Sequence, residues 1–518
     1  MHENYFNELI NTNLDFSNYS IDTYKNNLDE YGLATVWDNI LHFVMHNNNI
    51  PDILKTENFG ELYEIGLAHI DKENKKSMGK YYTPPDVAEL MASWLLELQG
   101  SNICDVGCGV GNLILAYLRI CDNPYELINS SKIYLYDKDP IALKICKYSI
   151  GILYGEKLLN KINVIHCDFL DREISLPQDA KVIINPIYCR IKEYSANWEM
   201  TPIIKQAKDY YAAFMEKVIK QSVSSVLITP YSFMGAKNFY NLREFLNNYD
   251  GFMITFDNVP GNIFFGKKKG IFNTNTSNAV RATITVVENK SEIKGFKTSP
   301  MLRFKTSERE QVLNKVFLES TISKNQQIIS KTNNVYFKCQ KELEPVFENW
   351  KRCSSTTFKD LLGNSQYKIY IPDTSRYFIT GAVKQLNRTG LICLSFKDEE
   401  AFNFAYALLN SSFAYWYWRM VDGGFNLTQT LIENIPIFTS KTTEEQHNEI
   451  LEIVSEMINK ENDYIVTKMN AGKLQENIKF PENYRNKLNK ILLNMLDINC
   501  SEKTFEVLHK NNLFNEME

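Results

Sequence analysis

A short polar and aromatic segment near the middle of this chain suits the binding of an amino group on a planar ring. Asn185-Pro186-Ile187-Tyr188 comes directly after the apolar run Val182-Ile183-Ile184. The Asn185 amide and the Pro186 main-chain carbonyl supply two hydrogen-bond acceptors, and the Tyr188 ring supplies a flat face for stacking. Asn-Pro is also common in turns, so this interpretation depends on supporting motifs elsewhere in the chain.

A glycine-rich turn earlier in the chain is typical of a nucleotide-type cofactor site. Residues 101–106 predict a strand, and Gly107, Gly109 and Gly111 follow it at alternate positions before a helix-like stretch. Such glycines permit a tight turn and let a ligand approach the backbone, and the following helix directs its free N–H groups at that ligand. Asp105 lies two residues before the first glycine. The G-x-G-x-G spacing argues against a dinucleotide site, which has G-x-G-x-x-G.

Acidic residues end the next two predicted strands. Asp137 follows the strand over 132–136, and Asp168 follows the strand over 163–166 with Phe169 beside it. In open α/β sheets the carboxyl ends of the strands form the ligand-binding edge. We therefore expect Asp137 to accept hydrogen bonds from ribose hydroxyls and Asp168 to accept one from an adenine amino group. Phe169 is expected to pack on the adenine ring, and S-adenosyl-L-methionine is the cofactor that best fits this set.

Taken in order, these motifs resemble those of the gamma-class amino-methyltransferases of DNA. That group includes adenine methylases, type I modification subunits and single-chain restriction–modification enzymes. The matching segments are GKYYTP (79–84), DVGCGVG, LYDKDP, CDFL, NPIY and LITPYSF (227–233). The resemblance implies an α/β fold, a doubly wound Rossmann-like methyltransferase sheet. It implies cofactor-binding roles for Tyr82, Thr83, Asp105, Gly107, Gly109, Asp137, Asp168 and Phe169, and catalytic roles for Asn185, Pro186 and Tyr188.

The same resemblance implies how these residues act. Thr83 and nearby main chain would hold the cofactor's carboxylate, and Asp105 would line its methionine part. The family has a second proline where this chain has Ile187. The Asn185 amide, the Pro186 carbonyl and the Tyr188 ring are all kept, but the backbone φ angle at residue 187 is no longer fixed by a proline ring. The target base must leave the duplex before its amino group can react. Phe264 or Phe265 would pack on the side of the base opposite Tyr188, with core packing as the alternative.

Length and composition limit the class of protein. The 518 residues predict several domains, and the 44% apolar content is enough for a fully folded chain. No long apolar run or signal-peptide pattern is present, so we expect a cytoplasmic protein without a membrane partner. Ten cysteines without C-x-x-C pairs fit a reducing compartment, and no metal site is expected because Cys104 and Cys108 have no histidine cluster nearby.

The net charge of −5 argues against nucleic acid as a partner, but the charge is unevenly distributed. Between residues 266 and 305, nine Lys and Arg residues stand against two Glu residues, an excess of seven that could face phosphates. A solvated linker is the alternative from Lys290 onward. The expected DNA contacts are Lys267, Lys268, Lys269, Arg376, Lys384, Arg388 and Arg419. The last four are each expected to be a phosphate contact or surface charge more than a base reader.

The sequence pattern divides the chain into five predicted regions. Residues 1–78 are expected to be helical, 79–290 to form the methyltransferase domain, and 291–330 to be a connector. Residues 331–440 predict an α+β target-recognition domain, since they resemble the specificity domains of single-chain enzymes and type I recognition subunits. Residues 441–518 predict a C-terminal helical region.

The sequence as a whole predicts a site-specific DNA adenine N6-methyltransferase. It would flip its target base out of double-stranded DNA and take the methyl group from S-adenosylmethionine. A restriction endonuclease or specificity subunit would be a separate chain. Three alternatives stay open: an N4-cytosine methyltransferase, which would use the same grip; a protein glutamine methylase, which has no use for residues 331–440; and a catalytically impaired DNA-binding module, with Ile187 as the lesion.

Overall fold

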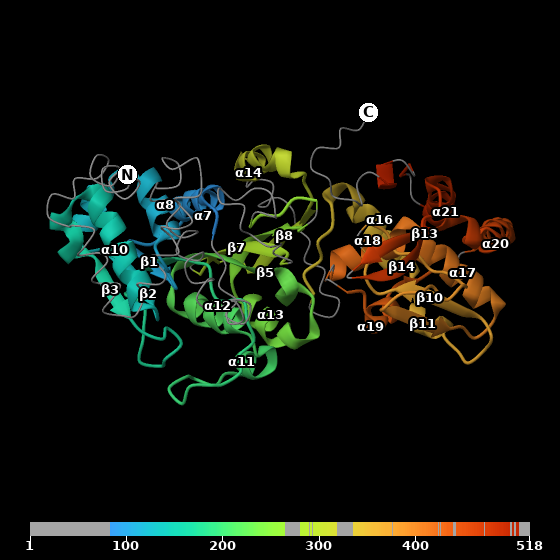
Figure 1. The fold of residues 1–518 in the computed structure, drawn as a ribbon, viewed down its shortest axis with the longest axis horizontal. Coiled ribbons are helices and arrows are strands. Elements are labelled where there is room, and N and C mark those ends of the chain that lie inside the picture. The colour runs from blue at the N-terminus through green and yellow to red at the C-terminus, as the bar shows by residue number, and fades with distance from the viewer. Residues whose placement is uncertain are drawn as a thin grey trace. The chain divides into compact units, whose positions relative to one another are not determined.

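The computed structural model describes residues 83–506, apart from residues 259, 265–279, 290, 293, 319–334, 376, 423, 425, 439–441, 471, 498–499 and 502–503. The chain forms two compact units (Figure 1). The first consists of Met1–Thr298 and Phe304–Asn334, and the second of Ser299–Arg303 and Val335–Glu518. The predicted helical region over residues 1–78 lies outside the described residues.

A sheet of eight strands forms the centre of the first unit as the structure describes it, in the order β3-β2-β1-β4-β5-β7-β6-β8. Strands β1 to β5 are parallel to one another, and β7 runs antiparallel between β5 and β6. The bounds are β1 Asn102–Val106, β2 Ile133–Asp137, β3 Asn163–His166, β4 Ala180–Ile184, β5 Ser224–Pro230, β6 Asp250–Phe256, β7 Ala282–Glu288 and β8 Gly295–Leu302. The predicted doubly wound α/β sheet is confirmed.

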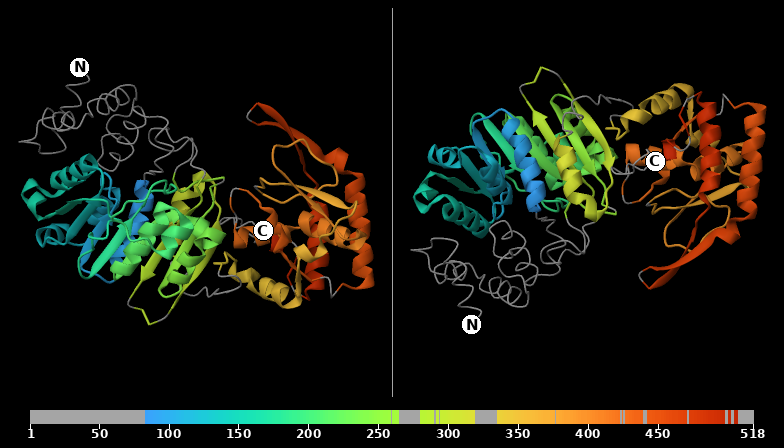
Figure 2. Two further views of the ribbon diagram at one scale, coloured as in Figure 1. Left: turned by 90° about the horizontal axis from the view of Figure 1, so that it is seen from below. Right: turned by 90° about the horizontal axis from the view of Figure 1, so that it is seen from above.

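Helices cover both faces of this sheet, so its central strands are nearly continuous apolar runs, and every residue of β4 is buried. Helices α7, α8 and α14 pack together on one face, and α11, α12 and α13 pack together on the other (Figure 2). The bounds are α7 Pro85–Glu97, α8 Asn112–Ile120, α9 Pro124–Asn129, α10 Pro140–Tyr154, α11 Pro202–Ala207, α12 Tyr210–Gln221, α13 Tyr240–Leu246 and α14 Arg309–Leu318. Helix α7 starts at Pro85, directly after Pro84, because Pro is favoured in the first turn.

The second unit packs its helices around an aromatic core. The Trp350 ring centroid lies 5.1 Å from that of Phe413 and 5.9 Å from that of Trp416. The helices are α16 Glu344–Cys353, α17 Glu399–Asn410, α18 Ser412–Val421, α19 Gln429–Glu433, α20 Glu444–Asn459 and α21 Glu482–Met495. The antiparallel pairs are β9 Thr356–Thr357 with β12 Pro436–Ile437, β10 Lys368–Pro372 with β11 Leu391–Ser395, and β13 Ile465–Asn470 with β14 Lys473–Ile478.

The C-terminal part of the chain differs from the prediction in two respects. Helices α20 and α21 are present, but an antiparallel ribbon of β13 and β14 lies between them in the chain, so the region is not purely helical. The predicted boundary at residue 440 does not separate compact units, since α17 contacts both α20 and α21. Across the described part of the chain, no helix combines the length and apolar composition that a membrane span requires.

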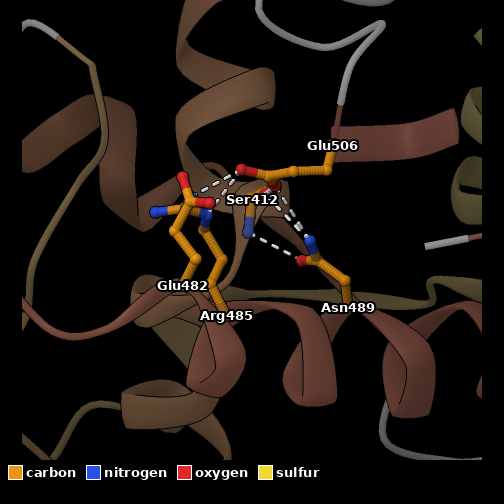
Figure 3. A network of polar contacts seen from close by, with 5 residues as sticks. All are labelled: Ser412, Glu482, Arg485, Asn489 and Glu506. Carbon is orange, nitrogen blue, oxygen red and sulfur yellow. Dashed lines mark hydrogen bonds and ion pairs between the residues drawn. The ribbon is translucent and has the colours of Figure 1, made fainter. Parts of the chain in front are cut away.

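A buried polar network ties α21 and Glu506 to the start of α18 (Figure 3). Asn489 is fully buried, and its Oδ1 accepts a hydrogen bond from the Ser412 main-chain N–H at 2.8 Å. Its Nδ2 donates to Ser412 Oγ at 2.9 Å and to Glu506 Oε2 at 3.3 Å. Glu506 also accepts from the Ser412 hydroxyl and from the Arg485 guanidinium. One side-chain amide therefore joins three segments of the second unit.

We predict that Asn489→Ala lowers the free energy of unfolding of the second unit by about 2–3 kcal/mol, because it leaves buried groups of Ser412 and Glu506 without their amide partner. The exposed Asn494 on the same helix is a matched control, and Asn494→Ala should change that free energy by less than about 0.5 kcal/mol. Urea denaturation followed by tryptophan fluorescence measures both. Equal effects of the two substitutions would contradict the role given to the network.

Candidate active site

The glycine turn between β1 and α8 forms an open backbone cradle. Gly107 and Gly109 have φ angles of 68° and 53°, and a Cβ at either position would meet no heavy atom within 4 Å. Gly111 has a different reason to be glycine, because a Cβ there would lie 2.5 Å from the Cys146 Sγ of α10. The turn therefore needs glycine for its backbone shape at all three positions and leaves space at two of them.

Asp105, at the carboxyl end of β1, is a buried carboxyl group with one satisfied oxygen. Its Oδ2 accepts a hydrogen bond from the Ile114 N–H in the first turn of α8 at 3.1 Å, whereas its buried Oδ1 has no hydrogen-bond partner in the structure as described. Burial raises the pKa of Asp105 to about 8, and the nearby charge of Asp137 adds to the rise. A cationic ligand group beside the open glycine turn would favour the ionised carboxylate and supply a partner for this oxygen.

Asp137, at the end of β2, fastens the glycine turn to the neighbouring strand. Its Oδ2 accepts from the Gly109 N–H at 2.7 Å, and its Oδ1 accepts from the Asp139 N–H at 2.8 Å. A carboxylate oxygen can accept more than one hydrogen bond. Asp137 can therefore orient the turn and still receive ribose hydroxyls.

Asp168 and Phe169 follow β3 but face different surroundings. Asp168 is paired with Lys138 at 3.3 Å, and its Oδ1 accepts from the Leu170 N–H at 3.1 Å. Phe169 is 4% exposed and stacks on Phe214 with ring centroids 5.9 Å apart. The structure gives Phe169 a packing role in the core, and its adenine contact stays a prediction.

Thr83 connects the Asn-Pro-Ile-Tyr segment to the glycine turn. The Asn185 Nδ2 donates to the Thr83 Oγ1 at 2.8 Å, and the Asn112 Nδ2 donates to the Thr83 carbonyl at 3.3 Å. Asn112 opens α8 directly after the turn, and Thr83 itself is 4% exposed. Three motifs far apart in the sequence thus meet at one residue.

Tyr188 and Phe264 lie next to each other. The Tyr188 hydroxyl donates to the Ile228 carbonyl of β5 at 2.8 Å, which fixes the ring. The Phe264 ring lies edge-on to it with centroids 6.0 Å apart. Phe264 is 1% exposed. In this structure Phe264 is packed in the protein, so a contact with a target base stays a prediction that requires its movement.

A residue that the sequence did not indicate, Arg309, holds the segment that carries Phe264. Arg309 of α14 is 6% exposed and donates to the main-chain carbonyls of Asn262 and Ile263 at 2.8 and 2.7 Å. Its guanidinium also forms a two-pronged ion pair with Asp86 of α7, at 2.6 and 2.9 Å. Arg309 lies in the predicted connector and no motif precedes it, so only the folded structure identifies its role.

The basic stretch between residues 266 and 305 is less exposed than its sequence indicates. Arg281 is 8% exposed and pairs with the buried Asp257 at 2.8 Å. Arg303 is 4% exposed, and its guanidinium donates to the Tyr415 hydroxyl at 2.9 Å. These two cations stabilise the protein interior, which reduces the charge available to phosphates.

The residues of the second unit that were predicted to contact DNA differ in how far they are exposed to solvent. Lys384 is exposed, and its Nζ donates to the Asn462 Oδ1 at 3.0 Å. Arg388 donates to Thr374 at 2.7 Å and to Asn477, and partial burial lowers its pKa. The expectation that Arg419 is a surface charge is wrong, because it is 2% exposed inside α18. The remaining predicted residues, Tyr82, Phe265, Lys267, Lys268, Lys269 and Arg376, lie outside the described residues.

The pKa of Asp105 predicts how the stability of the first unit depends on pH. The folded protein keeps a proton on Asp105 up to about pH 8, whereas the unfolded chain releases it near pH 4. The stabilising contribution of this group is therefore complete below about pH 4 and is lost as the pH rises through about 8. We predict a steeper fall in the free energy of unfolding between pH 5 and 8 for the wild type than for Asp105→Asn.

Urea denaturation at several pH values measures this difference. Asp122→Asn, at an exposed carboxylate of the same unit, should keep the pH dependence of the wild type. An Asp105→Asn protein whose stability falls as steeply as that of the wild type would contradict the assignment.

Comparisons with known proteins match different shares of this chain. A family model described as N-6 DNA Methylase matches residues 54–328, slightly more than half of the chain. The chain is 29% identical over 140 residues to the type I restriction enzyme MjaIX methylase subunit of Methanocaldococcus jannaschii, a match that covers 27% of this chain and only 24% of that relative.

Among solved structures, a type I restriction–modification methyltransferase subunit from Streptococcus thermophilus has a TM-score of 0.36 at 14% identity, over 54% of this chain and 61% of that chain. The type ISP restriction–modification enzyme LlaGI, in complex with a DNA substrate mimic, has a TM-score of 0.44 at 11% identity, over 88% of this chain and 63% of that chain.

Proposed function

The chain belongs to the N-6 DNA methylase family, and we propose that it is a site-specific DNA adenine N6-methyltransferase. The proposed substrates are an adenine flipped out of double-stranded DNA and S-adenosylmethionine. The observation that carries the proposal is the hydrogen bond from Asn185 to Thr83 at 2.8 Å. It brings the residue proposed to bind the target base against the residue proposed to bind the cofactor.

The cofactor side of the proposal is supported by the glycine turn. The open cradle at Gly107 and Gly109 and the unmet Oδ1 of Asp105 fit the cationic methionine part of S-adenosylmethionine. Asp137 would receive the ribose hydroxyls and Asp168 the adenine amino group. When bound, this cofactor supplies an electrophilic methyl group on a sulfonium. In this proposal these side chains bind and orient the cofactor and form no covalent bond with it.

The base side of the proposal uses acceptors in place of a general base. An exocyclic amino nitrogen is a poor nucleophile because its lone pair is delocalised into the ring. Asn185 Oδ1 and the Pro186 carbonyl would accept its two hydrogens and favour a pyramidal nitrogen whose lone pair points at the methyl group. Both act as preorganised dipoles where positive charge develops. Tyr188 would stack on the flipped base and offset part of the few kcal/mol that flipping costs.

The hydrogen bond to Thr83 fixes the orientation of the Asn185 side-chain amide. A hydroxyl that donates its proton to a carboxylate keeps only acceptor capacity. While the Thr83 hydroxyl donates a hydrogen bond to the cofactor carboxylate, its oxygen would accept one from Asn185 Nδ2. That bond would turn the Asn185 Oδ1 toward the base. In this proposal Thr83 is a positioning residue that makes the grip on the base depend on the bound cofactor.

We predict that Asn185→Ala lowers the single-turnover rate of tritiated methyl transfer to unmethylated duplex DNA at least ~100-fold, because one of two preorganised acceptors is lost. Asn160→Ala, at an exposed asparagine of the same unit, should leave the rate unchanged. Base-resolved sequencing of the product distinguishes adenine from cytosine as the target. A wild-type protein that binds cofactor and transfers no methyl group would refute the proposal and favour a DNA-binding module with Ile187 as the lesion.

We predict that Thr83→Val lowers the single-turnover rate about 10-fold or more at saturating cofactor, since the amide of Asn185 loses its acceptor. Thr83→Ser keeps the hydroxyl and should restore most of the rate. Measuring cofactor affinity by calorimetry separates weaker binding from slower transfer. Equal single-turnover rates for Thr83→Val and Thr83→Ser at saturating cofactor would show that Thr83 does not position Asn185.

A further inference from the structure

The ribbon of β13 and β14 is an exposed element that no sequence motif indicated. Its strands pair from Ile465 with Ile478 to Asn470 with Lys473. Toward the outer end, large apolar side chains remain open to solvent: Val466 is 37%, Met469 63% and Leu474 52% exposed. Met469 and Leu474 are direct cross-strand partners. The outer half of the ribbon therefore has no covering layer within the described part of the second unit, and it extends away from the helices of that unit (Figure 2).

The base of the ribbon is held firmly. The Glu476 N–H donates to the Asn387 carbonyl at 3.0 Å, and the Gln475 side chain donates to Thr389 at 3.2 Å. Ile478 packs with Ala382 and Leu386 in one apolar cluster. A loop that contains Lys384 and Arg388, two of the predicted DNA contacts, thus runs beside β14. The ribbon and these cations belong to one surface.

The charge of this surface suits a polyanion. Residues 465–475 contain two lysines and no Asp or Glu, and both Lys468 and Lys473 are exposed. Two carboxylates beside the ribbon are bound to protein donors. Glu476 accepts from the Asn387 N–H at 2.8 Å, and the buried Glu461 accepts from the main-chain N–H groups of residues 383 and 384. The cations at the tip are therefore not neutralised by the ribbon itself.

We propose that the β13–β14 ribbon enters a groove of duplex DNA, a proposal that rests on DNA being the substrate. A two-stranded antiparallel ribbon has a width that the major groove admits. Lys468 and Lys473 contact phosphates, and Met469 and Leu474 present apolar surface to base edges such as the thymine methyl group. The ribbon thereby contributes to sequence recognition from a part of the chain outside the predicted recognition domain.

Replacing the two lysines tests the phosphate contacts. Fluorescence anisotropy with a labelled duplex of mixed sequence, between 50 and 200 mM salt, gives the affinity and its salt dependence. Lys468→Ala/Lys473→Ala should weaken binding by roughly tenfold and reduce the log–log salt slope by about 1.8, since each phosphate contact contributes about 0.9. The matched control is Lys132→Ala/Lys157→Ala, two exposed lysines near the amino ends of β2 and β3. It should bind as the wild type does.

Replacing the apolar pair tests the base contacts. Met469→Ala/Leu474→Ala should keep the salt slope of the wild type but select a less restricted set of sequences from a random duplex library. If this variant instead changes only self-association in sedimentation, with DNA selection intact, the surface joins two copies of the chain and the ribbon proposal is wrong.

The results of these binding and methylation experiments distinguish a failure of the ribbon proposal from a failure of the proposed methyltransferase function. Unchanged affinity and salt slope in the lysine variant, with a wild type that methylates DNA, would refute the ribbon proposal and leave the methyltransferase standing. A wild type that binds duplex through these lysines and transfers no methyl group would refute the methyltransferase and support the ribbon. A wild type that binds no duplex would refute both.

Discussion

The hydrogen bond from the Asn185 amide to the Thr83 hydroxyl is the interaction on which the candidate site depends. It joins the end of β4 to the start of α7, and the Thr83 carbonyl receives a second amide from Asn112 at the start of α8. Thr83 is 4% exposed, so these bonds compete little with water and are correspondingly strong. The segments proposed to hold the cofactor and the target base consequently share one residue, and neither can move without affecting the other.

A second constraint on the first unit is that a buried charged side chain needs a partner of opposite charge. The buried guanidinium groups of Arg281 and Arg309 have carboxylate partners, Asp257 and Asp86. Breaking such a pair would leave an isolated buried charge, which is strongly unfavourable. Asp105 differs, because no described cation is paired with it and burial raises its pKa to about 8. Perturbed carboxyl groups of this kind are frequent at functional sites, and Asp105 lies two residues before the open glycine turn.

The β13–β14 ribbon illustrates why an exposed element escapes sequence reasoning. A strand is recognised from its alternation of apolar and polar residues, which arises when one face is buried. The outer ribbon is exposed on both faces, so Val466, Met469 and Leu474 have no regular alternation with their polar neighbours. The turn signal is weak too, because Gly472, with a φ angle of 76°, stands alone near the tip.

Local sequence patterns were enough to predict the parallel sheet, the glycine turn and the acidic residues at strand ends, because these depend on neighbouring residues and on glycine's backbone freedom. Which charged side chains are buried follows from the folded chain, since exposure is set by segments distant in the sequence. Arg419, expected at the surface, is 2% exposed, and Arg309, expected in a connector, lies at 6% exposure against Asp86. The carboxylate that makes the burial of Arg309 tolerable lies more than 200 residues earlier in the sequence, and no local pattern encodes the pair.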